Sequence, residues 1–210
     1  MNKPFSDIIS SEQELRDLLG YPSEVVNMKV ITHLDSHCKR FISLSPLVFL
    51  STANNTGQCD VSPRGDEAGS VKVLDHQHLV IAERPGNRRM DTLINILSNP
   101  SIGLIFIIPT LEETCRINGQ AYIIKDQSIL EQMSVEGKIP KLAIGVKVEE
   151  CYIHCAKAFK RSKLWEPTSW SVRDNLPHIP TVISAHINSP NYTADVIEKG
   201  LQESYEKRLY

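Results

Sequence analysis

A short basic stretch, Gly86-Asn87-Arg88-Arg89, contains residue types that together can bind a phosphate group. Glycine lets the backbone turn closely, and asparagine is a good N-cap for the helix that follows. Two arginines at the start of a helix offer planar, bidentate donors beside the positive end of the helix dipole. We therefore predict that Asn87, Arg88 and Arg89 bind phosphate, although arginines at the end of a loop can also be solvated surface charges.

The elements around this stretch must present it at the end of a strand. An apolar run precedes it, and Met90, Leu93, Ile94 and Leu97 follow at helical spacing until Asn99-Pro100 ends the helix. From residue 46 the chain is a series of short apolar runs separated by turn residues, which predicts a β-meander with a hairpin turn at residues 54–57. The predicted strands are 47–52, 58–62, 71–74, 78–82, 102–108, 114–124 and 147–155.

Helices are expected at the two ends of the chain. Ser11 and Glu14 form a capping box, and Gly20 stands where that first helix would end. A second helical pattern runs from Pro22 to Phe41, and a further helix is predicted at about 127–136. Prolines in the tail predict no regular element there until a helix that begins at Thr193. The run 102–108 is apolar throughout, which is typical of a strand buried on both faces.

Four segments in this order resemble the pyridoxamine 5′-phosphate oxidase-like flavoproteins over about residues 46–125. They are residues 61–66, the stretch 86–89, the run 102–106 and Arg116-Ile117-Asn118-Gly119-Gln120-Ala121. The resemblance implies a mainly β fold with α (α+β), an FMN-binding split β-barrel with peripheral helices. It implies one domain over residues 1–210, with a helical segment at about 1–45, the barrel at about 46–155, and a C-terminal loop and helix at 156–210. It also implies a homodimer with FMN in a groove between the subunits.

The resemblance assigns residues to the cofactor by their position in the matching segments. The stretch at 86–89 would hold the FMN phosphate. The segment that would run along the isoalloxazine ring comprises Ser62, Pro63, Arg64 and Gly65. Two residues of a later strand, Thr114 and Arg116, would approach the flavin, often from the partner subunit; they are equally compatible with simple strand residues.

The C-terminal part departs from the vitamin B6 oxidases. Those enzymes carry a tryptophan-containing strand followed by an Arg-x-His pair that grips the substrate, whereas this chain continues through residues 155–165. The departure argues against oxidation of pyridoxamine phosphate, and the stretch resembles a subgroup described only as FMN-dependent flavoproteins. We predict that an anionic substrate is bound by Lys157, Arg161, Ser162 and Trp165. The alternative is a solvated cationic face with the tryptophan packed beneath it.

The function implied is an FMN-dependent oxidoreductase acting on a small molecule, because flavin itself carries the electron or hydride. No nucleophile-elbow, HExxH or Walker motif is present, so the commonest hydrolase readings lack support. One alternative is a non-catalytic flavin-binding redox or stress-related protein. A haem-degrading relative is a third, and it would need His154 or His186 to face the haem.

Composition limits the partners and the compartment. A net charge of −2 gives no global attraction to nucleic acid or anionic membranes, and no apolar window reaches the length of a membrane helix. Five cysteines without a CxxC pair indicate a reducing compartment, so we expect a cytoplasmic protein whose cysteines are mostly small core residues. No metal is expected: Cys151, His154 and Cys155 point to different faces of a strand, and His33 and His37 lack a third ligand.

Overall fold

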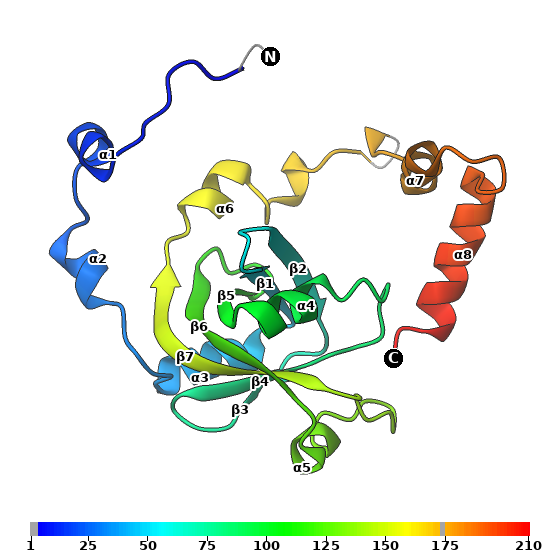
Figure 1. Ribbon diagram of the computed structural model, residues 1–210, viewed down its shortest axis with the longest axis horizontal. Helices are drawn as coiled ribbons and strands as arrows, with labels where there is room; N and C mark the ends of the chain where they lie inside the picture. The colour runs from blue at the N-terminus through cyan, green and yellow to red at the C-terminus, as the bar shows by residue number, and fades with distance from the viewer. Residues whose placement is uncertain (1–3, 173–174) are drawn as a thin grey trace.

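The computed structural model describes residues 4–172 and 175–210. Seven antiparallel strands form one sheet in the order β2-β1-β5-β6-β7-β4-β3, which curls into a split barrel (Figure 1). The strands are β1 (Leu47–Ala53), β2 (Cys59–Gly65), β3 (Lys72–Val73), β4 (His78–Ala82), β5 (Ser101–Ile107), β6 (Thr114–Ile124) and β7 (Ala143–His154). The expected mixed α+β split barrel is confirmed.

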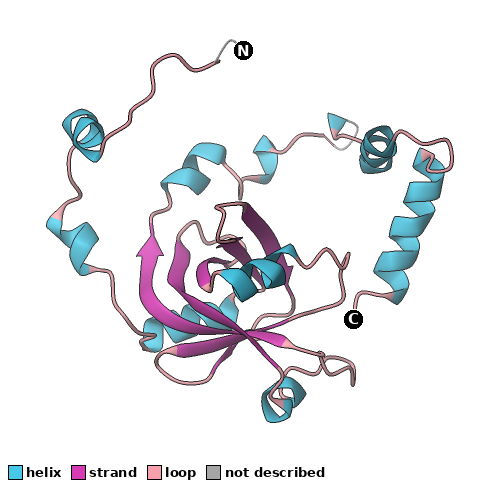
Figure 2. Cartoon of the chain, viewed as in Figure 1, coloured by secondary structure: helices cyan, strands magenta, loops and turns pink. Residues whose placement is uncertain are grey.

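Helices lie around the strands rather than between them (Figure 2). In chain order they are α1 (Glu12–Leu19), α2 (Glu24–Met28), α3 (Ser36–Leu44), α4 (Asp91–Ser98), α5 (Gln127–Glu131), α6 (Lys157–Ser162), the 3₁₀ turn η1 (Pro167–Ser169), α7 (Ile179–Ile187) and α8 (Ala194–Lys207). Among the described helices, none is long and apolar enough to cross a membrane.

The barrel interior is one apolar core. Alternate residues of β1, β5, β6 and β7 point inward, as period-two patterning requires, and α3 and α4 each add apolar side chains. The largest side chains that are fully buried include Leu34, Ile42, Leu50, Leu79, Leu104, Phe106, Ile117 and Ile144. The core therefore forms between the strands of the barrel and the two helices α3 and α4, which cover it.

A bulge between β6 and β7 lets these long strands bend. The pairing register shifts between Asn118 and Gly119. A Cβ atom on Gly119 would lie 2.1 Å from the backbone carbonyl oxygen of Lys147, so only glycine fits there. Gly119 thus permits the close approach on which the curvature of the barrel depends.

The prediction that strand 102–108 is buried on both faces is wrong for the single chain. In β5 the residues Ile102, Leu104 and Phe106 point into the core, while Ile105 on the other face is 38% exposed. A run that is apolar throughout therefore covers the core with one face only. On the second face Ile105 is exposed, whereas Ile107 is buried.

The second predicted helix is divided in two, contrary to the expectation of one pattern from Pro22 to Phe41. Ile31 leaves helical geometry because it forms a backbone bridge with Cys151 of β7, with N–O distances of 3.0 and 2.7 Å. Asp35 then caps α3, its side chain accepting from the Cys38 N–H at 2.7 Å. His33 consequently lies outside α3, and the expected shared helix face of the two histidines does not form.

The tail is more regular than its prolines predicted. Helices α6 and α7 form there, and Pro180 sits in the first turn of α7, where the missing N–H costs nothing. Two other boundaries differ: α5 ends at Glu131, five residues early, and β7 begins at Ala143 rather than Lys147. The extra residues of β7 pair with both β4 and β6, which fixes them as strand.

Candidate functional site

The turn at residues 86–90, called here the arginine turn, joins β4 to α4 in a strained conformation. Arg88 and Met90 both have left-handed backbones, with φ of 62° and 60°. The prediction that Asn87 caps the helix is wrong: Met90 is the N-cap, and α4 begins at Asp91. The Asn87 side chain instead accepts a hydrogen bond from the Arg89 N–H at 3.0 Å, which folds the turn on itself.

Both arginines of this turn are exposed. Arg89 pairs through Nε with Asp91 at 2.8 Å, and this hydrogen bond and charge raise the pKa of the guanidinium. Arg88 has no hydrogen-bond or ion-pair partner among residues 4–172 and 175–210. The turn therefore presents two guanidinium groups, one of them with all its donors open to a ligand.

Strand β2 lies beside this turn at the edge of the sheet. Its side chains Asp60, Ser62 and Arg64 point toward α4. The hydroxyl of Thr92 donates to Asp60 at 2.6 Å and lies 3.0 Å from that of Ser62. Arg64 forms an ion pair with Glu83. Ser62 and Arg64, predicted to lie along the flavin ring, are thus tied into a polar network that holds β2 against α4.

The free edge of β2 remains open to a ligand or another chain. Only β1 pairs with β2, so the backbone groups on its other side have no strand partner in the described chain. Pro63 sits within this strand, as edge strands allow. Pro63 and Gly65 have exposed positions on the face away from α4.

A second ion pair, which the sequence did not reveal, adjoins the first. Arg84 contacts Asp66 through Nε at 2.7 Å, and both side chains are mostly buried. Tyr210 donates its hydroxyl hydrogen to Asp66 at 2.8 Å, and the Arg84 guanidinium lies 5.6 Å from its ring centroid. Burial raises the pKa of Asp66, but the hydrogen bonds from Tyr210 and Arg84 outweigh it and hold that pKa below its ordinary value. Because Tyr210 is 144 residues from Asp66, no local sequence pattern predicts this contact.

Thr114 and Arg116 belong to a different group, called here the Arg116 cluster. Its members lie at one end of β6 and β7 and comprise Lys29, Thr114, Arg116, Tyr152 and His154. The guanidinium of Arg116 lies 5.4 Å from the Tyr152 ring centroid, and its Nε is buried without a hydrogen-bond partner in the described part of the chain. Such an orphaned donor indicates a missing ligand or partner atom.

The charges in this cluster also set the state of its histidine. Burial, then the positive charges of Arg116 and Lys29, lower the pKa of His154. The imidazole is therefore neutral at pH 7 and offers one donor and one acceptor. The cluster as a whole is a cationic, partly buried surface suited to an anion or a polar ring.

Within one described chain, the Arg116 cluster lies apart from β2 and the arginine turn. The register places Arg116 opposite Ile105, Ile105 opposite Phe49, and Phe49 opposite Pro63. Three strand spacings of about 4.8 Å separate the two ends of this row by about 14 Å along the sheet. A hollow of about 270 Å³ beside Arg89, between α4 and the β1–β2 hairpin, is smaller than most ligand pockets. This hollow alone is too small to enclose a flavin.

The predicted substrate residues lie on and after α6. Lys157, Arg161 and Ser162 are exposed. Trp165 stacks on Phe159 with ring centroids 5.9 Å apart and donates its indole N–H to the Leu111 carbonyl at 3.0 Å. The tryptophan therefore anchors α6 to the β5–β6 loop.

Comparison with known proteins gives a family and a set of distant structures. The sequence profile described as pyridoxamine 5′-phosphate oxidase matches residues 34–155, more than half of the chain. No curated protein matches in a sequence search.

Three solved structures illustrate the distant likeness. HupZ of Group A Streptococcus is 21% identical, over 57% of this chain and 92% of its own, with a TM-score of 0.46. An FMN-binding protein from Syntrophomonas wolfei is 8% identical, over 68% and 96%, with a TM-score of 0.42. A FAD-binding protein from Mesorhizobium loti is 16% identical, over 60% and 99%, with a TM-score of 0.40.

Proposed function

The chain belongs to the pyridoxamine 5′-phosphate oxidase family, a flavin-binding family, and we propose that it is an FMN-dependent oxidoreductase acting on a small molecule. The observation that carries the proposal is that the matched residues 34–155 contain β2, the arginine turn and the Arg116 cluster's two β6 residues. Every residue expected to touch the cofactor lies in that segment. FMN is favoured over FAD because the basic turn is the size of one phosphate monoester.

The arginine turn suits the phosphate of FMN. Arg88 and Arg89 are exposed on one turn, and Arg88 has no partner among the described residues that would compete with a phosphate. A guanidinium group can donate two parallel hydrogen bonds to two phosphate oxygens. Both arginines belong to the same strained turn, so both can reach one phosphate. Asp91 beside Arg89 limits the positive charge there, so Arg88 contributes the larger part of the binding.

The ring of FMN fits along the edge of β2. The strand offers unpaired backbone groups over Ser62 to Gly65, and its inward side chains are already fixed by Thr92 and Glu83. A rigid strand with free donors and acceptors can hydrogen-bond the polar edge of a ring without an ordering cost. Flavin, when bound, supplies the electron or hydride transfer.

The separation of the two groups supports a homodimer. Arg116 is about 14 Å from Pro63 within one chain, and its buried Nε lacks a partner. A two-fold axis that pairs the apolar outer face of β5 with its copy would place the Arg116 cluster of one subunit near β2 of the other. Thr114 and Arg116 would then contact the flavin held by the partner.

We place the substrate beside the exposed cations of α6. Lys157 and Arg161 give this helix positive charge near the cationic Arg116 cluster, which favours an anionic small molecule. Trp165 fixes the helix through its contact with Leu111, and we assign it to substrate binding together with Lys157, Arg161 and Ser162. The five free cysteines support a reducing, cytoplasmic location.

The decisive experiment is a cofactor titration with a matched pair of variants. We expect purified protein to show flavin absorption and to release FMN, identified by mass. Replacing both arginines of the turn, Arg88→Ala and Arg89→Ala, should weaken FMN binding about 100-fold or more, because each charge-assisted bond is worth about 1.5–3 kcal/mol. Arg161→Ala, which removes an exposed arginine elsewhere, is the control and should leave FMN affinity unchanged.

The outcomes separate the parts of the proposal. Unchanged FMN affinity in the double variant would show that the phosphate lies elsewhere, and FAD in place of FMN would overturn the cofactor assignment. A bound flavin that no reductant or oxidant turns over at a useful rate would favour the non-catalytic alternative. A monomer with FMN bound would exclude the shared site.

A further inference from the structure

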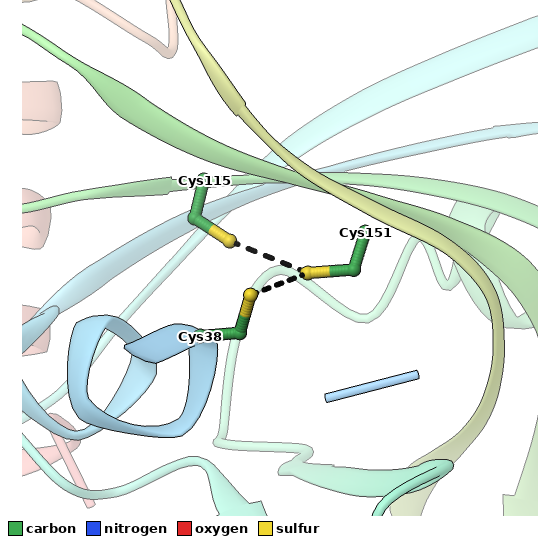
Figure 3. Close-up of side chains that lie close together, drawn as sticks. All are labelled: Cys38, Cys115 and Cys151. Carbon is green, nitrogen blue, oxygen red and sulfur yellow. Dashed lines mark hydrogen bonds between the residues drawn. The ribbon is translucent and has the colours of Figure 1, made fainter. Parts of the chain in front are cut away.

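Three cysteines that are distant in sequence meet inside the barrel, beneath α3 (Figure 3). Cys38 comes from α3, Cys115 from β6 and Cys151 from β7. The Sγ of Cys151 lies 3.1 Å from that of Cys38 and 3.8 Å from that of Cys115, and all three sulfurs lie within 4.8 Å of one another. We call them the thiol cluster.

The thiol cluster is sealed from solvent. Cys115 and Cys151 are 0% exposed and Cys38 is 5% exposed, and all three belong to the main apolar core. A cysteine that serves only as a small apolar residue needs no sulfur neighbour. Here each sulfur is directed at the other two, which is the arrangement of a ligand set (Figure 3).

The spacing of the sulfurs matches that around one metal ion. Metal–sulfur bonds of about 2.3 Å place thiolates about 3.8 Å apart in a tetrahedral site and about 4.0 Å apart in a trigonal planar one. The distances of 3.1 and 3.8 Å, with the third below 4.8 Å, bracket these values. Movements of less than about 1 Å per sulfur would complete a trigonal site.

The backbone holds the three sulfurs in place. Cys38 lies in the first turn of α3, where Asp35 accepts from its N–H at 2.7 Å and the helix dipole favours a thiolate. Cys151 is fixed by its two backbone bonds to Ile31. These backbone contacts hold Cys38 and Cys151 in position for a shared ligand.

A disulfide accounts for this geometry less well than a metal. Cys115 lies opposite Ile153, and Cys151 lies opposite Ile117, so the two cysteines are diagonal neighbours on β6 and β7. Diagonal residues have Cα atoms about 7–8 Å apart, beyond the usual reach of a disulfide. A bond between Cys38 and Cys151 would leave the third sulfur unused.

We propose that Cys38, Cys115 and Cys151 bind one soft, thiophilic metal ion in three-coordinate geometry, with Cu⁺ as the best match. Soft thiolates select Cu⁺ and Zn²⁺ among the common ions. Zn²⁺ takes a fourth ligand, and the described residues place no fourth Cys, His, Asp or Glu in the cluster, while burial excludes water. The site is independent of the FMN proposal. Each thiol that becomes a ligand releases its proton, so binding weakens as pH falls.

The test is an anaerobic titration of the reduced protein with Cu⁺ against a colorimetric Cu⁺ chelator, followed to equilibrium because the sulfurs are buried. The variant Cys59→Ser with Cys155→Ser removes the two exposed thiols and keeps the cluster. We expect it to take one Cu⁺ per chain, with sulfur-to-metal charge-transfer absorption and three sulfur ligands by X-ray absorption. Adding Cys151→Ser in this background should weaken binding at least 100-fold.

Two results would overturn the proposal: no Cu⁺ withdrawn from the chelator by the protein with only the cluster thiols, or equal binding after Cys151→Ser. Zn²⁺ retained in the cluster against excess Cu⁺ would overturn the choice of ion. Should Cys151→Ser fail to fold by circular dichroism, Cys38→Ser gives the same comparison from the helix side. The sulfur count from X-ray absorption needs no cluster variant at all.

Discussion

The barrel buries its apolar side chains in a core, whereas the two helical arms of this chain leave theirs exposed. In the barrel, strands from β1 to β7 enclose a continuous core. The N-terminal arm, residues 4–30, contains α1 and α2, neither of which buries a residue. The C-terminal arm, residues 175–210, contains α7 and α8, which bury only Pro180. The two arms lie on opposite sides of the barrel, and the C-terminal arm returns to it at Tyr210 (Figure 1).

This difference shows which part of the molecule buries its apolar side chains within a single chain. Helices shorter than about 12–15 residues are marginal without packing, and α1 and α2 expose Leu18, Leu19, Val25 and Met28 at 70% or more. Apolar stripes of this kind mark interaction surfaces. The barrel can therefore fold on its own contacts, whereas the arms are suited to packing on a second chain of the proposed dimer.

The same small substitution should have very different effects on stability in the barrel and in the arms. Gly119→Ala forces a Cβ against the Lys147 carbonyl in the barrel, whereas Gly200→Ala in α8 adds a methyl in open space. We expect Gly119→Ala to lower the free energy of unfolding by more than about 4 kcal/mol, because a backbone oxygen cannot move aside as a side chain can. Urea unfolding followed by circular dichroism measures both. Equal stability of the two variants would contradict the role given to the bulge.

Substitutions in the arms should change the affinity of the proposed dimer and leave the stability of the barrel unchanged. Replacing Leu18 and Val25 by aspartate removes two apolar side chains, each worth at least about 1.5 kcal/mol when buried. We expect dimer affinity to fall by about 3 kcal/mol, a factor above 100, while barrel unfolding is unchanged. Sedimentation equilibrium gives the affinity. Gln13→Asp with Asn27→Asp adds the same charges at polar positions of α1 and α2 and is the control; a dimer unaffected by the first pair would mean that the arms pack elsewhere.

Helix caps provide a smaller and closely matched comparison. Asp35 caps α3, which covers the core, and Ser11 caps the unpacked α1 by accepting from the Glu14 N–H at 3.2 Å. Either cap is worth about 1 kcal/mol to its own helix. We expect Asp35→Ala to lower global stability by about that amount and Ser11→Ala to lower it by none. If both changed the urea midpoint equally, α1 would be part of the cooperative barrel unit.

The same division explains what the sequence could predict. Signals that act within a few residues were correct: the capping box at Ser11, the end at Gly20, the hairpin at residues 54–57, and the whole of β6. In that hairpin the Asn54 side chain accepts from the N–H groups of Thr56 and Gln58, and Gly57 has a φ of 84°. These features depend only on local backbone chemistry.

Predictions failed where a distant partner decided the conformation. The pattern from Pro22 to Phe41 is helical in spacing, yet pairing with Cys151 breaks it at Ile31. The helix expected at Asn87 begins at Asp91, because the turn adopts two left-handed residues that ordinary propensities disfavour. Such strained segments are typical of functional sites.

For the candidate site, sequence reasoning identified residues but not their grouping. The cofactor-binding roles assigned to Ser62, Arg89 and Arg116 remain predictions. The structure places Ser62 and Arg89 in one group and Arg116 in another. Asp60, Glu83 and Thr92, which fix β2, were missed because their partners are up to 32 residues away. The thiol cluster was likewise invisible, since 113 residues separate Cys38 from Cys151.

An effect of similar size to that of a helix cap is expected at the point where the C-terminal arm contacts the barrel. Tyr210 donates to Asp66, so Tyr210→Phe should lower stability at pH 7 by about 0.5–1.5 kcal/mol, because water replaces part of the bond at this half-buried ring. The pKa of Asp66 in the native protein is below that of the unfolded chain, about 3.9. Its contribution is therefore full above that pH and is lost as pH falls through the native pKa.

The variant should lose less stability in that acid window, because without the phenol hydrogen bond the pKa of Asp66 rises toward its ordinary value. Unfolding curves at pH 7 and across pH 4 to about 2 would show the two proteins converging as the carboxyl takes up its proton. Tyr205→Phe, on exposed α8, is the control and should match the parent protein at every pH. A constant difference between Tyr210→Phe and the parent across the window would mean that the ring's packing on Arg84, rather than its bond to Asp66, attaches the arm to the barrel.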